Sequence, residues 1–179
     1  MRLGRRISSV HAAVEVPSFA SVAERHLDDV HSYLVYFTRD RGLAEDLTGE
    51  TFERALRQWR RFDPRRGSAR TWLCQLARST ALDHFRGEER RRRREGRYAV
   101  AEVRESAEPA FGEGLSPALE RALAQLSAAE REVIALRVLL ELDGEATARV
   151  LGISTSACST RLSRALQKLE KEVSSGVAA

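Results

Sequence analysis

A chain of 179 residues, 42% hydrophobic and 31% charged, has the size of one medium soluble domain or two small ones. No apolar run reaches the length of a membrane span, and residues 1–16 lack the apolar block of a secretory signal. Residues 60–97 carry 13 arginines against 5 acidic residues, so the net charge of +4 is concentrated in one segment, as in proteins that bind nucleic-acid phosphates.

The apolar residues recur with helical spacing, and no segment shows the sustained alternation of a β-strand. The first two helices are predicted over residues 18–39 and 43–61, separated by a break at Asp40–Gly42. On the second helix, Leu47 and Leu56 are among the residues expected on the inner side. The N-terminal part of the chain is therefore expected to be a helical unit.

A basic loop punctuated by Pro64 and Gly67 follows the second helix. Ser68 is a favourable N-cap for a third helix that runs out into the arginine string Arg90–Arg94. That string, taken alone, is also compatible with a solvated surface. Trp59 and Trp72 fall on apolar stripes, which favours core packing over a role as stacking platforms for bases.

Periodicity fades over residues 95–114, where Glu, Gly and Ala accumulate, and this composition is typical of a flexible linker. Ser116-Pro117 then gives an N-cap followed by proline at the first helical position. Ser127 and Glu130 have the spacing of a capping box, which opens a helix that continues through Leu140.

The last part of the chain has a helix-turn-helix layout. A short helix over residues 143–151, a tight turn at Gly152–Ser154 and a longer helix over residues 155–172 are predicted. The outward side chains of the longer helix are mostly short and hydrogen-bonding, so it could lie in a DNA major groove. A plain helical hairpin would have the same pattern. The predicted fold class is all-α, with two small helical domains (18–94 and 115–174) joined by a flexible linker (95–114), the C-terminal domain being a helix-turn-helix.

Four stretches, in this order, resemble the extracytoplasmic-function (ECF) class of bacterial sigma factors, in the sigma-70 superfamily. They are Ala44–Phe52; Gly67–Leu73 with Ala77-Arg78 and Ala81–Arg86; Leu126–Val133; and Leu151–Ser154 with Arg161–Ala165. The resemblance covers about residues 18–173. It implies a protein that binds core RNA polymerase and promoter DNA to start transcription, and it makes an anti-sigma factor a possible further partner.

The resemblance also implies three sets of functional residues. Polymerase binding is expected from an acidic rim around an apolar centre, formed by Glu45, Asp46, Leu47, Glu50 and Phe52. Recognition of the minus-ten element, with capture of its single strand, is expected from Arg61, Arg65, Arg66, Arg70, Arg78, Asp83 and Arg86. Recognition of the minus-thirty-five element is expected from Thr155, Ser156, Ser159, Thr160, Arg161 and Arg164.

The chain departs from the family pattern at a few positions. Gly49 stands where the family usually has glutamine, and a mid-helix glycine costs about 1 kcal/mol of helix stability relative to alanine. Ala157 and Ser159 replace a threonine and a lysine in the recognition helix. Thr147 puts a hydroxyl where an isoleucine normally packs. We therefore expect an unusual minus-thirty-five element or weak binding to it.

Other functions account for less of the sequence. A stand-alone helix-turn-helix regulator that binds DNA as a dimer would explain residues 116–173 only. A helical adaptor that binds other proteins would give the arginine run no role beyond that of a solvated surface. No cluster offers a nucleophile with a base, so no catalytic residue is expected. Two distant cysteines (Cys74, Cys158) and four scattered histidines predict a reducing cytoplasm, with no disulfide, metal or cofactor.

Overall fold

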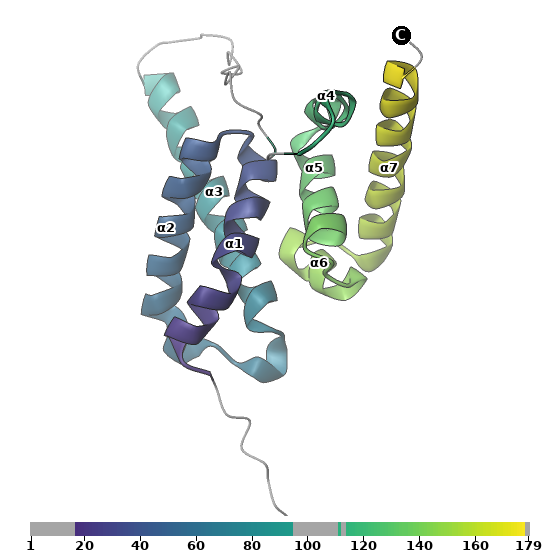
Figure 1. Cartoon of the computed structure of the whole chain (residues 1–179). Coiled ribbons are helices and arrows are strands. Elements are labelled where there is room, and N and C mark those ends of the chain that lie inside the picture. Colours follow the sequence, from purple (N-terminus) through teal and green to yellow (C-terminus); the bar gives the residue numbers. More distant parts are fainter. Residues whose placement is uncertain (1–16, 95–110, 112–113, 178–179) are drawn as a thin grey trace, which may run out of the picture.

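The computed structural model describes residues 17–94, 111 and 114–177, and its described part contains helices and no strand. The helices form two groups that lie side by side (Figure 1). The first group comprises α1 (Phe19–Thr38), α2 (Arg41–Gln58) and α3 (Ala69–Arg94); the second comprises α4 (Pro117–Gln125), α5 (Ala128–Ile134), α6 (Gly144–Leu151) and α7 (Thr155–Val177). The predicted all-α fold class, with a C-terminal helix-turn-helix, is confirmed.

The helix starts follow the capping residues that the sequence offers. The Ser68 hydroxyl accepts a hydrogen bond from the Thr71 N–H at 3.1 Å, and Ser116 accepts from Leu119 at 3.2 Å. Ser127 and Glu130 form the predicted capping box. Each of these caps satisfies backbone donors that a helix N-terminus leaves free, and so fixes where the helix begins.

Two predicted boundaries need correction. The break between the first two helices lies at Arg39–Asp40 and not at Asp40–Gly42, because the Asp40 carboxylate accepts from the Leu43 N–H at 2.9 Å and thereby caps α2. The helix that continues from α5 is also less regular than expected, since Ala135–Leu139 forms a π-helical turn. At the other end of α2, Trp59–Arg61 forms a short 3-10 helix, η1.

Most of the predicted linker lies outside the described residues, but Phe111 does not. Its side chain is only 5% exposed, and its ring packs against that of Tyr36 at a centroid distance of 5.2 Å. The Arg39 guanidinium lies 5.9 Å from the same ring centroid, within the range of a cation–π contact. At this residue the linker is attached to α1, which the composition of the segment did not indicate.

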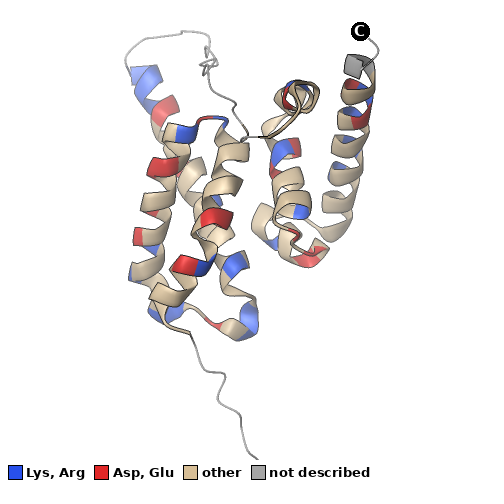
Figure 2. Cartoon of the chain, in the orientation of Figure 1, with Lys and Arg blue, Asp and Glu red and all other residues tan. Residues whose placement is uncertain are grey.

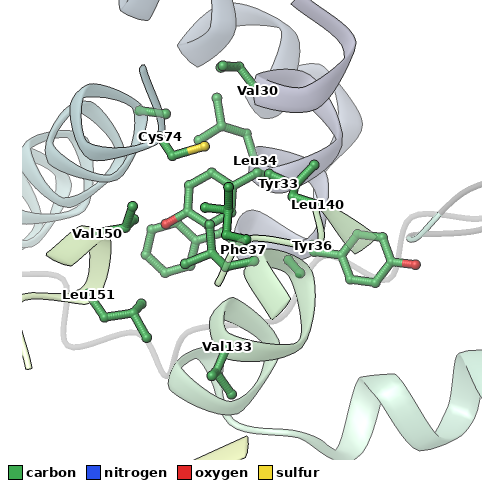
Figure 3. Close-up of a cluster of buried hydrophobic side chains, with 14 of the residues drawn as sticks. Val30, Tyr33, Leu34, Tyr36, Phe37, Cys74, Val133, Leu140, Val150 and Leu151 are labelled. Atoms are coloured by element: carbon green, nitrogen blue, oxygen red, sulfur yellow. The ribbon is translucent and has the colours of Figure 1, made fainter. Parts of the chain in front are cut away.

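The two helical groups share one buried core. Side chains of α1 such as Tyr33 and Phe37 gather in the same cluster as Val133, Val150 and Leu151 from the second group (Figure 3). The sequence indicated two domains on a tether; the structure packs them against each other. This contact determines which of the expected functional surfaces are open.

Candidate polymerase and nucleic-acid interfaces

The acidic face of α2 is open to solvent, and acidic residues recur along this helix (Figure 2). Glu45, Asp46 and Glu50 are exposed. Leu47, by contrast, is 1% exposed and belongs to the core, so its expected place at the apolar centre of this surface was wrong. Phe52 is half-buried against Phe19, at a ring-centroid distance of 6.4 Å.

Leu56 is instead a large apolar side chain that α2 exposes. It is 60% exposed, although the sequence pattern placed it inward. Its spacing of three and seven residues from Glu53 and Gly49 puts all three on one face of α2. An exposed leucine beside carboxylates suggests an interaction surface. Hydrophobic periodicity did not predict this exposure, because Leu56 directly follows Ala55, which is buried.

The basic loop between α2 and α3 encloses a cavity of about 380 Å³. Asp63 caps the 3-10 turn η2 (Pro64–Arg66) by accepting from the Arg65 N–H at 3.0 Å. Gly67 then takes a φ of +150°, which side chains disfavour. The cavity is lined by Arg61, Phe62, Asp63, Arg66, Gly67, Ser68, Thr71, Trp72, Gln75 and, from the second helical group, Arg149.

Aromatic rings form one side of this region. Phe62 stacks on Trp59 with ring centroids 4.8 Å apart, and its centroid lies 5.4 Å from that of Trp72. Trp59 and Trp72 are both half-buried and packed against the core cluster. Trp72 also lines the cavity, so packing and access to a ligand are compatible for this side chain. Guanidinium groups beside aromatic walls are suited to an unstacked base with its phosphate.

The seven residues expected at the minus-ten element do not form one free surface. Arg61, Arg65 and Arg66 are exposed on the loop. Arg70 donates to Asp29 of α1 at 2.9 Å and is engaged within its own helical group.

The remaining three lie further along α3. Asp83 pairs with Arg86 at 3.2 Å and with Arg54 of α2 at 3.4 Å, and both contacts are exposed. Arg78 donates through Nε to Glu132 of α5 at 2.9 Å. Of the loop arginines, Arg61 and Arg66 thus line the cavity, whereas Arg70 and Arg78 are held by carboxylates.

The outer face of α7 presents short polar side chains. Thr155, Ser156, Ser159, Thr160 and Arg164 are exposed and Arg161 is half-buried, while Cys158 and Ala165 pack inward. A second hollow, of about 530 Å³, lies between this helix and the start of α5 and is lined in part by Arg161 and Arg164.

The packing of the helix-turn-helix explains two sequence features. Gly152 ends α6 at a φ of +67°, a left-handed conformation that favours glycine. Thr147, at the position where the family has isoleucine, is fully buried, and its hydroxyl donates to the Asp143 carbonyl at 2.8 Å. The hydroxyl is therefore satisfied within its own helix and leaves only the methyl group to pack.

Polar groups are also buried where the two helical groups meet. The Glu132 carboxylate, 3% exposed, accepts from the Tyr33 hydroxyl at 2.8 Å as well as from Arg78. Burial and the neighbouring Glu132 raise the pKa of Tyr33 well above its usual value. Arg131 donates to the Tyr36 carbonyl at 3.1 Å, and burial, with Arg39 nearby, lowers the pKa of Arg131 to about 10.

Among the residues that the structure describes, no three His, Cys, Asp or Glu side chains gather into a metal site. Within the same ranges, none of the helices combines the length and hydropathy that crossing a bilayer requires.

Two family profiles match the chain, one to each helical group. Sigma-70 region 2 matches residues 22–91, and Sigma-70 region 4 matches residues 116–169. The acidic helix, basic loop and arginine-bearing helix thus fall in the first region, and the helix-turn-helix falls in the second. Together these matches define a protein of the sigma-70 type.

Individual relatives narrow the class. The ECF RNA polymerase sigma factor SigC of Mycobacterium tuberculosis is 33% identical over 141 residues, which cover 79% of this chain and 75% of SigC. BldN of Streptomyces coelicolor, also an ECF sigma factor, is 35% identical over 162 residues, which cover 89% of this chain but only 61% of BldN. The chain belongs to the ECF RNA polymerase sigma factors.

A solved structure shares the fold. The sigma factor RpoE of Bartonella quintana, crystallised with the anti-sigma factor NepR, superimposes with a TM-score of 0.75 at 22% identity, covering 89% of this chain and 98% of RpoE.

Proposed function

We propose that this protein binds core RNA polymerase, recognises promoter DNA and starts transcription in the bacterial cytoplasm, without catalysing a reaction itself. The observation that carries this proposal is that both helical groups match sigma-70 regions, one over residues 22–91 and the other over residues 116–169. A stand-alone helix-turn-helix regulator is excluded by the first of these matches, because such a regulator would need only the second region.

The polymerase surface is proposed to be the acidic face of α2. Glu45, Asp46 and Glu50 are exposed there, and Leu56 supplies an apolar side chain that is 60% exposed. A few carboxylates around one apolar anchor suit a basic helical partner surface, since the charges orient the partner and the leucine is desolvated on docking.

The minus-ten element is proposed to bind at the basic loop and the cavity behind it. The exposed Arg61, Arg65 and Arg66 would follow the phosphates, and the cavity that Phe62 and Trp72 line would receive an unstacked base. Arg78, Asp83 and Arg86 continue this surface along α3.

The minus-thirty-five element is proposed to bind α7. Its exposed hydroxyls at Thr155, Ser156, Ser159 and Thr160 are short, so the helix can approach base edges closely. Arg161 and Arg164 are the candidates for phosphate or guanine contacts. Two weak DNA modules on one chain gain avidity when both are engaged.

A regulator that masks these surfaces is a further proposal. RpoE, whose fold this chain shares, was crystallised with an anti-sigma factor. Affinity purification of the tagged chain from its own cells should recover one dominant partner besides polymerase; recovery of polymerase alone would remove this part of the proposal.

In vitro transcription tests the proposed function. Purified protein is added to bacterial core polymerase on a pool of genomic promoter fragments, beside an Asp46→Arg, Glu50→Arg variant. A second variant, Glu24→Arg, Asp28→Arg, makes the same charge change at exposed acids of α1 and serves as the control.

We expect starts that depend on the protein, that persist in the control and that fall at least about tenfold in the α2 variant. The tenfold figure corresponds to about 1.4 kcal/mol of binding free energy. Absence of any protein-dependent start, together with failure to co-elute with core polymerase, would reject the proposal. Equal loss in both variants would move the polymerase surface away from α2.

A further inference from the structure

Gly49 lies in the middle of α2, at a position where the fold of the chain does not call for glycine. The residue is exposed, and a Cβ added to it would meet nothing within 4 Å. Its backbone is helical, so no left-handed conformation requires glycine either. A glycine in a helix interior lowers stability relative to alanine. Neither the packing nor the backbone conformation of this chain therefore accounts for the residue.

The surface around Gly49 is largely acidic, as the charges along α2 in Figure 2 indicate. On a helix, the residues three and four positions away are surface neighbours. For Gly49 these neighbours are Glu45, Asp46, Phe52 and Glu53. The three acidic residues among them are exposed, and Phe52 is half-buried. Gly49 thus leaves a gap of one side chain in a surface bordered by carboxylates.

Most acids on this face of α2 have no cationic partner within the chain. In the part of the chain that the structure describes, no ion pair involves Glu45, Asp46 or Glu50. Elsewhere in the first helical group, Asp29 and Asp83 pair with arginines at 2.8 and 3.2 Å. The chain has a net charge of +4, so arginines are not scarce. These carboxylates are consequently available to a basic partner, whose charge they complement.

Leu56 lies on the same face of α2, seven residues beyond Gly49, and is 60% exposed. Seven residues at 1.5 Å each place the two positions about 10 Å apart along the helix axis. A helix with its side chains has a diameter of about 10–12 Å, so a single helix seated over Gly49 also reaches Leu56. The gap and the exposed leucine therefore fit one helical partner.

We infer that Gly49 is a specificity-determining position of the polymerase surface: a helix of core polymerase crosses α2 there, and one of its side chains fills the gap beside the α2 backbone. Leu56 packs against the flank of that helix, and the carboxylates pair with its basic side chains. The distance between packed helix axes depends on the side chains at the contact, and glycine permits the closest approach. The inference rests on the proposed function, since it concerns the α2 surface named there.

Substitutions at Gly49 separate docking from folding, because the two respond in opposite directions. Any ordinary helix-forming side chain has open space there and strengthens the helix, so the folded protein becomes more stable. The same side chain occupies the gap and holds the polymerase helix away from α2. Gly49→Ala adds a methyl group, and Gly49→Gln adds a longer, uncharged side chain.

Gly87→Gln is the matched control. It makes the same change in the interior of α3, away from the acidic face of α2. A Cβ at Gly87 would meet only the tip of the Arg90 side chain, at 3.9 Å. Its effect on helix stability is therefore comparable, and its effect on polymerase docking should be small.

Competition for core RNA polymerase measures docking in the absence of DNA. The unmodified full chain, labelled with a fluorophore at its N-terminal amine, is bound to core polymerase, and unlabelled variants displace it with anisotropy as the readout. Urea unfolding followed by circular dichroism records the stability of each variant. The Asp46→Arg, Glu50→Arg variant is measured alongside, because it reports whether polymerase docks on α2 at all.

We expect Gly49→Gln to weaken binding at least about tenfold, the effect of forcing extra atoms into a packed contact, with Gly49→Ala between it and the unmodified protein. Both should raise the urea midpoint, and Gly87→Gln should bind within about twofold of the unmodified protein. Undiminished binding by Gly49→Gln, beside weakened binding by Asp46→Arg, Glu50→Arg, would overturn the inference and leave the proposed surface standing. A lowered urea midpoint for Gly49→Gln would also overturn it. Undiminished binding by Asp46→Arg, Glu50→Arg would reject the proposed surface itself.

Leu56→Ala tests whether one polymerase helix covers both positions. Alone it should weaken binding about tenfold, as truncation of an apolar anchor in an interface does. In the Gly49→Gln background the polymerase helix is already displaced, so the further loss from Leu56→Ala should be less than about threefold. Equal losses in the two backgrounds would contradict the inference, because Gly49 and Leu56 would then act independently.

Discussion

At the scale of single residues, the backbone conformation decides what a side chain contributes. Gly49 lies inside α2 with nothing within 4 Å of a Cβ added to it, and Gly152 lies at the end of α6, also with open space but at a φ of +67°. Space is therefore equal at the two positions, and only the dihedral angle differs. A methyl group added at Gly49 should therefore raise the stability of the protein, and one added at Gly152 should lower it.

We predict that Gly49→Ala stabilises the protein by up to about 1 kcal/mol, because alanine loses less conformational entropy in a helix interior. Gly152→Ala should destabilise it by about 1–2 kcal/mol, the cost of a left-handed L-residue. Urea unfolding followed by circular dichroism measures both, with the slope of the transition expected to stay constant. A loss of stability in both variants would show that Gly49 is needed for something other than helix geometry.

Some single-residue features could be predicted from the sequence and others could not. Ser68, Ser116 and the Ser127–Glu130 box were predictable, because a cap depends on neighbours three residues away. Leu47 and Leu56 were both predicted to face inward, but only Leu47 is buried and Leu56 is 60% exposed, because the packing of α1 and α3 against α2 decides which part of the apolar stripe is covered. The sequence did not show how a hydroxyl at Thr147 could be buried; in the structure it donates to the Asp143 carbonyl.

At the scale of elements, α3 is longer than its packing requires. Phe85 still packs against Phe37 of α1, with ring centroids 5.8 Å apart, yet the helix continues to Arg94, about 14 Å further at 1.5 Å per residue. Figure 1 shows this end extending past α1 and α2, and Figure 2 shows its basic character. Like charges three and four residues apart disfavour a helix, while their position at its C-terminus favours it. A polyanion bound there would relieve the repulsion, which fits promoter phosphates.

We predict that Arg90→Ala, Arg92→Ala, Arg94→Ala weakens binding of promoter DNA by the polymerase complex and flattens its salt dependence. For duplex DNA the slope of log K against log salt should fall by up to about 0.9 for each phosphate that the variant no longer neutralises. The control removes three basic side chains that lie exposed elsewhere, through Arg25→Ala, Arg121→Ala, Lys171→Ala. Equal slopes in both triple variants would leave the arginine string a solvated surface.

At the scale of the whole molecule, the order of helices was readable from the sequence but their mutual packing was not. Tyr33 and Glu132 are 99 residues apart, and no local pattern connects them. Periodicity identifies which face of a helix is apolar, whereas the partner of that face depends on the folded chain. The linker composition pointed to independent domains, and the packing of Phe111 against Tyr36 of α1 was not predictable from that composition.

The burial of ionisable groups at and near this contact has a consequence for stability at high pH. The pKa of Tyr33 is raised well above 10.0 by burial and by Glu132, and burial raises the pKa of Cys74 to about 12 from 9.0. A raised pKa of an acid means that the folded protein favours the neutral form. The resulting stability is complete below the unfolded-state pKa and is lost as pH rises through the folded-state value. The pKa of Arg131 is lowered to about 10, so the contribution of this residue to stability increases as pH rises above 10 and partly offsets the loss from Tyr33 and Cys74.

Tyr33→Phe isolates the tyrosine contribution. We predict that the difference in unfolding free energy between the unmodified protein and Tyr33→Phe is constant from pH 7 to pH 9. It should then shrink as pH rises above 10, because only the unmodified protein has a buried hydroxyl that must ionise on unfolding. Urea denaturation at pH 7, 9, 10 and 11 measures it, and the first two values serve as the internal control. A difference that is unchanged at pH 11 would mean that Tyr33 titrates normally, and hence that its hydroxyl is not enclosed between the two helical groups.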